Sequence, residues 1–258
     1  MSVPGKIVLH RMGYYDDQDG IMRRYKAEEP SWESHLQKSR ELIIKAIDIF
    51  NPSTITVLGS GWLLDLPVEK MTMNKRSINL VDILLPEQIE NRIQIFRHVR
   101  FIQEDVTGGL ISGVYANVSR GIFKRRVNVE KILDFKPYEP PKDTDLVISL
   151  NLLSQLDAIP TDYLKKRTKV SDQEIRVLKE RVQQQHLDML QKRNSLLITD
   201  FYEHPVNSVD ISERRPTIAV DLPEGISREE WDWTFDTRKN YNPDTVTIFR
   251  VAGIIFRG

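Results

Sequence analysis

Polar side chains or glycines follow four short apolar runs in the first part of the chain. The first run ends in Gly-Ser-Gly at 59–61, and the next three lead to Asp82, Asp105 and Asn151. Glycine lets a ligand approach the backbone, and a carboxylate accepts hydrogen bonds from hydroxyl and amino groups. Asp82 lies 21 residues after the turn, near the spacing at which an acid meets ribose hydroxyls in nucleotide-binding α/β units. These groups therefore predict a site for a nucleotide-like ligand.

The apolar runs that place these groups are short and β-branched, which is typical of buried parallel strands. We expect strands at 55–58, 77–82, 99–103, 145–150 and 195–200. Helical patterns lie between them, and this alternation favours right-handed parallel crossovers. The predicted fold is therefore α/β, with an open, mostly parallel twisted sheet and helices on both faces.

Helix ends are marked by capping signals. Ser31 is the expected N-cap of a helix that ends before Pro52. Ser171 with Glu174 forms a capping box for a long helix reaching about Arg193. We expect the helix after the fourth strand to be interrupted by Pro160.

The last third of the chain predicts a polar loop and a hairpin. Residues 200–205, which follow the fifth strand, are expected to form the loop at the ligand-facing edge of the sheet. The runs 231–235 and 245–251, joined by turn-rich residues, predict an antiparallel β-hairpin.

With these motifs in this order, residues 30–258 resemble the class I methyltransferases that use S-adenosylmethionine. The resemblance implies a Rossmann-like domain over 30–258 whose sheet finishes in a C-terminal antiparallel hairpin. It also implies S-adenosylmethionine as the cofactor and methyl transfer as the activity, with Asn151 close to the methyl group. The cofactor-binding residues that it implies are Gly59, Ser60, Gly61, Asp82, Ile83, Asp105, Val106 and Asn151.

Two positions depart from the glycine-rich motif of this family. Val57 stands where an acid is usual, and Leu63 stands at the third glycine, which implies an altered turn. A non-catalytic protein on the same fold, binding a nucleotide or a partner chain, is therefore the alternative. A Rossmann-type dehydrogenase is disfavoured, because the turn is followed by a short connection and not by a GxGxxG motif opening a long helix.

Residues 1–29 carry aromatic and charged side chains without a period of 2 or 3.6. We expect an N-terminal extension, either strapped over the domain or acting as a lid on the cofactor site. The candidate substrate-contacting residues are Arg24, Tyr25, Trp32 and His35.

No catalytic motif stands out, because methyl transfer from a sulfonium mainly requires alignment of the reacting groups. The candidate catalytic residues are His204, a general base if the loop at 200–205 faces the substrate, and Asn151. Asp82 has a competing interpretation as the N-cap of a helix near Pro86.

The net charge of the chain limits the classes of binding partner that we expect. The 258 residues hold 37 Lys and Arg and 37 Asp and Glu, so no global field attracts nucleic acid or anionic membranes. The basic stretch 119–126 is expected to be a solvated face, since no second basic run accompanies it. A small-molecule substrate is therefore favoured over nucleic acid.

The chain has no cysteine, which excludes disulfides, thiol nucleophiles and thiolate metal sites. No pair among the five histidines has zinc-site spacing, so no metal is expected. No apolar run approaches the ~20 residues that span a bilayer, and the first residues lack the apolar core of a signal peptide. The expected compartment is the cytoplasm.

Overall fold

A computed structural model describes residues 3–118, 124–205 and 214–258 of the chain. The helices are α1 (Lys6–Met12), α2 (Tyr14–Phe50), α3 (Val68–Met71), α4 (Glu87–Ile93), α5 (Leu110–Asn117), α6 (Ala158–Arg167) and α7 (Asp172–Gln191). The strands are β1 (Thr54–Leu58), β2 (Ser77–Asp82), β3 (Val99–Gln103), β4 (Arg125–Arg126), β5 (Leu146–Leu150), β6 (Thr168–Lys169), β7 (Ser195–Pro205), β8 (Arg215–Pro216), β9 (Ser227–Asp236) and β10 (Thr247–Phe256). Short 3₁₀ turns cover Met73–Lys75, Val129–Lys131 and Leu153–Gln155.

The main sheet runs in the order β3-β2-β1-β5-β7-β10-β9, and β8 pairs with β7 beside this path. Neighbouring strands from β3 to β7 are parallel, whereas β10 is antiparallel to both β7 and β9. The carboxyl ends of β1, β2, β3 and β5 therefore meet at one edge, where ligands of open α/β sheets bind. This arrangement confirms the predicted fold class, including the C-terminal antiparallel hairpin.

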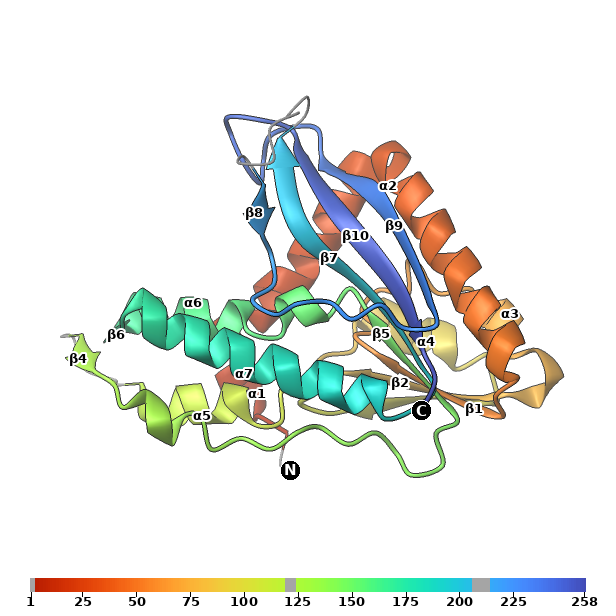
Figure 1. Cartoon of the computed structure of the whole chain (residues 1–258), viewed down its shortest axis with the longest axis horizontal. Helices are drawn as coiled ribbons and strands as arrows, with labels where there is room; N and C mark the ends of the chain where they lie inside the picture. Colours follow the sequence, from red (N-terminus) through yellow and green to blue (C-terminus); the bar gives the residue numbers. More distant parts are fainter. Residues whose placement is uncertain (1–2, 119–123, 206–213) are drawn as a thin grey trace.

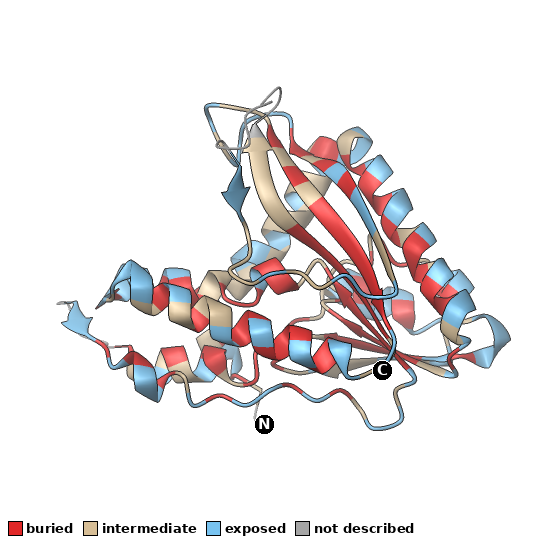
Figure 2. Ribbon diagram, viewed as in Figure 1, coloured by how far each residue is buried: buried red, intermediate tan, exposed pale blue. Residues whose placement is uncertain are grey.

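Helices cover both faces of the sheet (Figure 1). One core lies between the sheet and α5, α6 and α7, and the other lies between the sheet and α2, α3 and α4. Consecutive strand residues alternate between the cores: Val57 belongs to one and Leu58 to the other. Figure 2 shows that α2 also has two different faces. The face that follows the hairpin is buried, and the opposite face is exposed.

The start of α2 corrects the prediction that this helix begins at Ser31. The helix begins at Tyr14, and Pro30 lies inside it, where a proline removes one backbone hydrogen bond. Tertiary contacts of this part of the helix compensate for the missing backbone hydrogen bond. Buried Glu28 accepts hydrogen bonds from Thr237 Oγ1 at 2.8 Å and from the Arg238 backbone N–H at 3.2 Å. Residues 1–29, predicted to lack regular structure, thus include α1 and the first half of α2.

The loop predicted at 200–205 is part of β7. The long strand β10 continues the pairing, with Phe249 opposite Glu203 and Ile248 opposite His204. Backbone pairing with a partner distant in sequence therefore overrides the local polar composition.

Pro160 does not interrupt its helix, because it lies in the first turn of α6, where a proline costs no hydrogen bond. The capping box of α7 is confirmed: Ser171 Oγ accepts from the Glu174 backbone N–H, and Glu174 accepts from the Ser171 backbone N–H.

Candidate functional site

The turn after β1 is built around two glycines with positive φ. A Cβ on Gly59 (φ 79°) would lie 2.9 Å from the carbonyl oxygen of Leu150, so this position requires glycine for close packing on β5. A Cβ on Gly61 (φ 47°) would meet nothing closer than Gln18 Nε2 at 4.0 Å, so the space beside Gly61 is open. Between the glycines, Ser60 is buried and its Oγ has no hydrogen-bond partner in the described part of the chain.

Asp82 at the end of β2 is tied to this turn. Its carboxylate accepts hydrogen bonds from the backbone N–H of Gly61 at 2.8 Å and of Ile83 at 2.7 Å. Burial raises the pKa of Asp82, and the backbone bonds of Gly61, Ile83 and Leu84 oppose that rise. The competing interpretation of Asp82 as a helix cap is wrong, because Pro86 is the N-cap of α4 and no side chain caps it.

Asp105 follows β3, and only one of its two carboxylate oxygens has a hydrogen-bond partner among the described residues. Its Oδ1 accepts from the Thr107 backbone N–H at 2.9 Å and from Thr107 Oγ1 at 2.5 Å. Its Oδ2 is buried without a partner among the described residues. Burial raises the pKa of Asp105, and the bonds from Thr107 and Gly109 lower it. Oδ2 is thus an acceptor that an amino group of a ligand could satisfy.

At the end of β5, Asn151 forms a polar cluster with Asp65 and His35. Asn151 Nδ2 donates to Asp65 Oδ2 at 2.7 Å and lies 3.4 Å from His35 Nε2. Trp231 Nε1 donates to His35 Nδ1 at 3.1 Å. The Oδ1 atom of Asn151 is buried and unpartnered within the described chain. Asn151 takes a left-handed conformation (φ 48°), which an asparagine tolerates better than most residues.

Two members of this cluster have strongly shifted pKa values. Burial raises the pKa of Asp65 to about 6, and the nearby Arg40 and Asn151 reduce the shift. Burial lowers the pKa of His35 to about 3, so this imidazole is neutral at pH 7. Asp65 was not singled out from the sequence.

The turn that brings Asp65 here contains Leu63, which stands at the third glycine position of the predicted motif. Leu63 has φ 55° and is buried, and its backbone N–H donates to the Ser60 carbonyl at 3.0 Å. A residue with a Cβ in this left-handed conformation carries strain. The altered turn predicted from Leu63 is thus a left-handed one, followed two residues later by Asp65.

The first turns of α2 complete the edge with residues that sequence reasoning missed. Trp62 Nε1 donates to the Gln18 carbonyl at 2.8 Å, while Gln18 Nε2 is buried without a partner in the described residues. Burial raises the pKa of Tyr14, and the negative charges of Asp105, Asp17 and Asp82 raise it further. The sequence marked Tyr14 and Gln18 only as part of residues 1–29, a possible lid, because the helix that carries them was not predicted.

Other predicted site residues lie in the framework around this edge. Trp32 is buried, donates from Nε1 to the Phe235 carbonyl at 2.8 Å and stacks on the Phe235 ring. Arg24 lies over the same ring at 4.7 Å, and Tyr25 donates to Glu29 Oε1 at 3.2 Å. His35 stacks on Trp233, with ring centroids 4.0 Å apart.

His204 is a strand residue of β7, and its Nε2 lies 3.7 Å from Asp232 Oδ1 of β9, on the other side of β10. Ile83 and Val106 are partly buried and pack against the core containing α5 to α7. The structure thus brings together Ser60, Gly61, Asp82, Asp105 and Asn151, whereas His204 lies near the end of β7, opposite Ile248 of β10.

Nine buried side-chain nitrogen or oxygen atoms in the described chain have no partner, and four of them belong to this edge: Gln18 Nε2, Ser60 Oγ, Asp105 Oδ2 and Asn151 Oδ1. Native proteins pair nearly all such atoms, and each unpaired one costs about 1–3 kcal/mol. Two donors or donor-acceptors and two acceptors at one sheet edge fit a ligand with both hydroxyl and amino groups. The residues present therefore suit an adenosine-containing cofactor.

No group of three or more His, Cys, Asp or Glu side chains within 3–118, 124–205 and 214–258 is placed to hold a metal ion. In the same ranges, no helix combines the length and apolar character needed to cross a membrane.

No protein-family model matches the chain, and no curated protein matches it. Several solved structures are similar to it. One is 1,6-didemethyltoxoflavin-N1-methyltransferase from Burkholderia thailandensis with bound 1,6-didemethyltoxoflavin and S-adenosylhomocysteine, at 10% identity and TM-score 0.44, covering 100% of this chain and 92% of that one. A second is the N-methyltransferase NodS from Bradyrhizobium japonicum WM9 with S-adenosylhomocysteine, at 10% identity and TM-score 0.39, covering 86% and 87%.

A third is the DhpI complex with S-adenosylhomocysteine, at 9% identity and TM-score 0.33, covering 97% of this chain and 94% of that one. All three TM-scores are below 0.5, so the fold assignment rests on the strand order and the hairpin of this chain itself. These features give it the sheet predicted for the class I methyltransferases.

Proposed function

We propose that this protein is an S-adenosylmethionine-dependent methyltransferase that acts on a small molecule. The observation that carries this proposal is the set of four unpaired buried polar atoms where the ends of β1, β3 and β5 meet the first turns of α2. An adenosine-containing cofactor would pair them. The predicted cytoplasmic location is part of the proposal.

Each strand end has a role in this scheme. Gly61 leaves open space beside the backbone, Asp82 is the proposed acceptor for ribose hydroxyls, and Asp105 Oδ2 is the proposed acceptor for the adenine amino group. Ser60 Oγ supplies a further hydroxyl. The cofactor supplies a methyl group already activated on a sulfonium, so the chain needs chiefly to hold and orient the reactants.

Asp65 is the proposed positioning residue for Asn151. By accepting from Asn151 Nδ2, Asp65 holds the amide with its Oδ1 directed away from the protein's own donors. Asn151 can then accept a hydrogen bond from the methyl acceptor or the cofactor. The raised pKa of Asp65, about 6, leaves it largely ionised at pH 7 and able to hold this bond.

Calorimetric titration with S-adenosylhomocysteine and, separately, NAD tests the cofactor assignment. We expect binding of S-adenosylhomocysteine and none of NAD. Asp105→Asn should weaken S-adenosylhomocysteine binding about tenfold, because a charged acceptor becomes a donor. Asp143→Asn, an exposed carboxylate before β5 at the opposite edge, is the control and should bind normally. Binding of NAD alone would overturn the proposal.

The lid is the second part of the proposal. Tyr14 and Gln18 lie against the cofactor edge, which supports the prediction that residues 1–29 cover it. Arg24 and Tyr25 remain proposed substrate contacts. Removal of residues 1–29 cuts α2 just before Pro30, a residue suited to a helix start. We expect the shortened chain to fold and to lose S-adenosylhomocysteine affinity. Unchanged affinity in the shortened, folded protein would show that the segment is no lid.

A further inference from the structure

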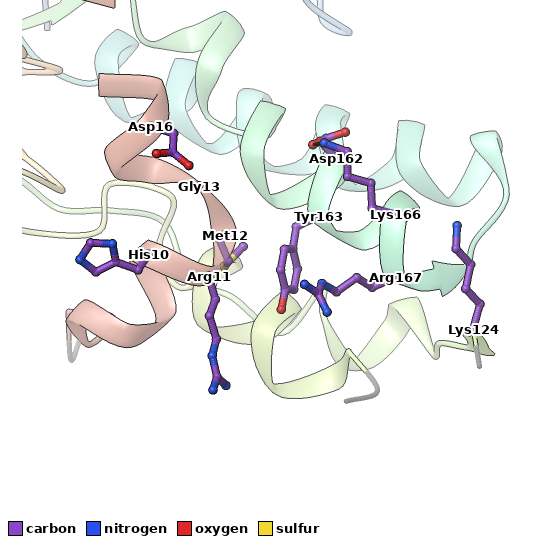
Figure 3. A pocket seen from close by; sticks show the side chains of 10 residues that line it. All are labelled: His10, Arg11, Met12, Gly13, Asp16, Lys124, Asp162, Tyr163, Lys166 and Arg167. Carbon is purple, nitrogen blue, oxygen red and sulfur yellow. Dashed lines mark ion pairs between the residues drawn. The ribbon is translucent and has the colours of Figure 1, made fainter. Parts of the chain in front are cut away.

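A pocket of about 440 Å³ lies beside the candidate cofactor edge, between α1, α6 and the residue preceding β4 (Figure 3). Its charged lining side chains are Arg11, Lys124, Lys166 and Arg167 against Asp16 and Asp162. Tyr163 forms its aromatic wall, and Arg11 and Arg167 lie on either side of that ring in Figure 3. The excess of cations suits an anionic ligand.

Three of the four cations lack a neutralising carboxylate in the part of the chain that the structure describes. Lys166 is paired with Asp162 at 2.7 Å. In the described residues, no carboxylate lies within ion-pair distance of Arg11, Lys124 or Arg167. Arg11 instead donates to Tyr115 Oη at 2.8 Å, and Lys124 donates to the Lys165 carbonyl at 3.0 Å. Neutral partners hold these side chains in place without cancelling their charge.

Arg167 is held in a way that leaves its donors available. Its guanidinium carbon lies 4.9 Å from the centroid of the Tyr163 ring, and Tyr163 in turn stacks on Tyr115. A guanidinium over an aromatic face keeps its in-plane N–H groups free to meet oxygen atoms, and this fork matches phosphate.

Strand pairing also places side by side two basic runs that are distant in sequence. Parallel strands β4 and β6 pair Arg125 with Thr168 and Arg126 with Lys169. The run 124–126 is thereby placed beside the run 165–169, which contains Lys165, Lys166 and Arg167. The sequence disfavours nucleic acid because of the neutral net charge and the lack of a second basic run; the fold places such a run beside the first.

Helix electrostatics explain only part of this cluster. Lys165, Lys166 and Arg167 occupy the last turn of α6, where cations are favoured by the helix dipole. That preference does not account for Arg11, which comes from α1, or for Lys124, which precedes β4. Cations from three separate segments line one pocket.

We propose that this pocket binds a phosphate group. The phosphate belongs either to a small phosphorylated molecule or to the backbone of a nucleic acid, since both present the same oxygens. The pocket and the candidate cofactor edge share the first turns of α2, because Gly13 and Asp16 line the pocket while Gln18 lies beside Gly61. Phosphate binding in this pocket does not depend on methyl transfer.

Titrations of the full chain with two probes test the proposal: inorganic tripolyphosphate by calorimetry, and fluorescein-labelled single-stranded RNA by anisotropy. The double variant Lys124→Gln/Arg167→Gln should weaken binding about tenfold or more. The matched control, Lys70→Gln/Arg97→Gln, removes one exposed lysine and one exposed arginine around α3 and α4 on the other face, and should bind as the unaltered protein does.

The two probes distinguish the sources. Binding of tripolyphosphate alone identifies a small phosphorylated ligand. Binding of RNA that the double variant loses, with a weaker salt dependence, identifies a nucleic acid backbone. Arg11→Gln, on a different helix, should weaken the same probe and thereby guards against misfolding of the double variant. The proposal is overturned if neither probe binds, or if the control variant loses as much affinity as the test variant.

Discussion

The two halves of α2 share one helix but differ in what they contact. Residues 31–50 present a continuous apolar face, including Trp32, Leu36 and Ile43, to the sheet and the hairpin. Residues 14–30 are mostly charged, polar or aromatic, and Glu28 is the one residue among them that is buried. This half carries Tyr14 and Gln18 to the candidate cofactor edge.

The difference separates the half that stabilises the protein from the half that completes its site. Apolar burial anchors residues 31–50, so their loss should lower the free energy of unfolding. Polar contacts and an unpaired amide characterise residues 14–30, so changes there should alter ligand affinity more than stability. The following predictions test this division.

Trp32→Ala should have the largest effect. It removes a buried indole that stacks on Phe235 and leaves the Phe235 carbonyl without its donor. Such truncations cost about 3–5 kcal/mol of unfolding free energy. Tyr25→Ala, half-buried in the first half of the helix, is the matched control and should cost clearly less in the same denaturant titration. Equal losses would erase the proposed division.

His35 should make stability depend on pH. Its folded pKa is lowered from 6.5 to about 3 by burial, so the unfolded state binds a proton between these values and the folded state does not. The stability from neutral His35 is complete above pH 6.5 and is lost as pH falls toward 3. The unaltered protein should therefore lose about 3 kcal/mol more than His35→Asn between pH 7 and pH 4.

This difference between the two proteins is the quantity to measure, by denaturant unfolding at each pH. Asp65 acts in the opposite direction, because its raised pKa of about 6 makes the folded state hold a proton more tightly as pH falls. Asp65 is present in both proteins, so its contribution largely cancels. Parallel pH profiles would show that the buried imidazole titrates as in the unfolded chain.

Gln18→Ala should reduce affinity and spare stability. Its Nε2 is buried without a partner beside Gly61, so its removal costs the free protein little. Losing one neutral hydrogen bond to S-adenosylhomocysteine should weaken binding by about threefold to tenfold. Calorimetry and unfolding on the same variant separate the two effects. A large fall in the unfolding midpoint with unchanged affinity would place Gln18 with the anchoring half.

Gly20→Ala should have the smallest effect, and a stabilising one. Gly20 lies inside α2, and a Cβ there would meet nothing closer than Arg23 Nη2 at 3.9 Å. Because Gly20 is helical, alanine should raise the free energy of unfolding by about 0.5–1 kcal/mol. A fall in stability would show that this half departs from a regular helix.

Much of the sheet could be predicted from sequence, because its signals are local. β2 and β3 have the predicted bounds, and β1 and β5 agree to within a residue, since each is a short apolar run bounded by polar or glycine residues. The strand ends then placed Ser60, Asp105 and Asn151 at one edge by topology alone.

The other parts of the fold and of the candidate site depend on tertiary contacts, which a single sequence does not reveal. The first half of α2 has a weak apolar pattern and contains Pro30, so only its tertiary contacts reveal a helix. The end of β7 is set by pairing with β10. Asp65 reaches Asn151 through a left-handed turn at Leu63, and a leucine gives no hint of such a conformation.

The position of β10 between β7 and β9 bears on how the chain is synthesised. β10 follows both of its neighbours in the chain, and β9 pairs with no other strand in the described sheet. On the ribosome, the parallel part of the sheet can form early, while β7 presents an open edge and β9 has nothing to pair with. Unpaired strand edges invite association with other chains. The nascent protein is therefore most exposed to aggregation just before β10 emerges, and a chaperone that shields β7 at that stage would protect its yield.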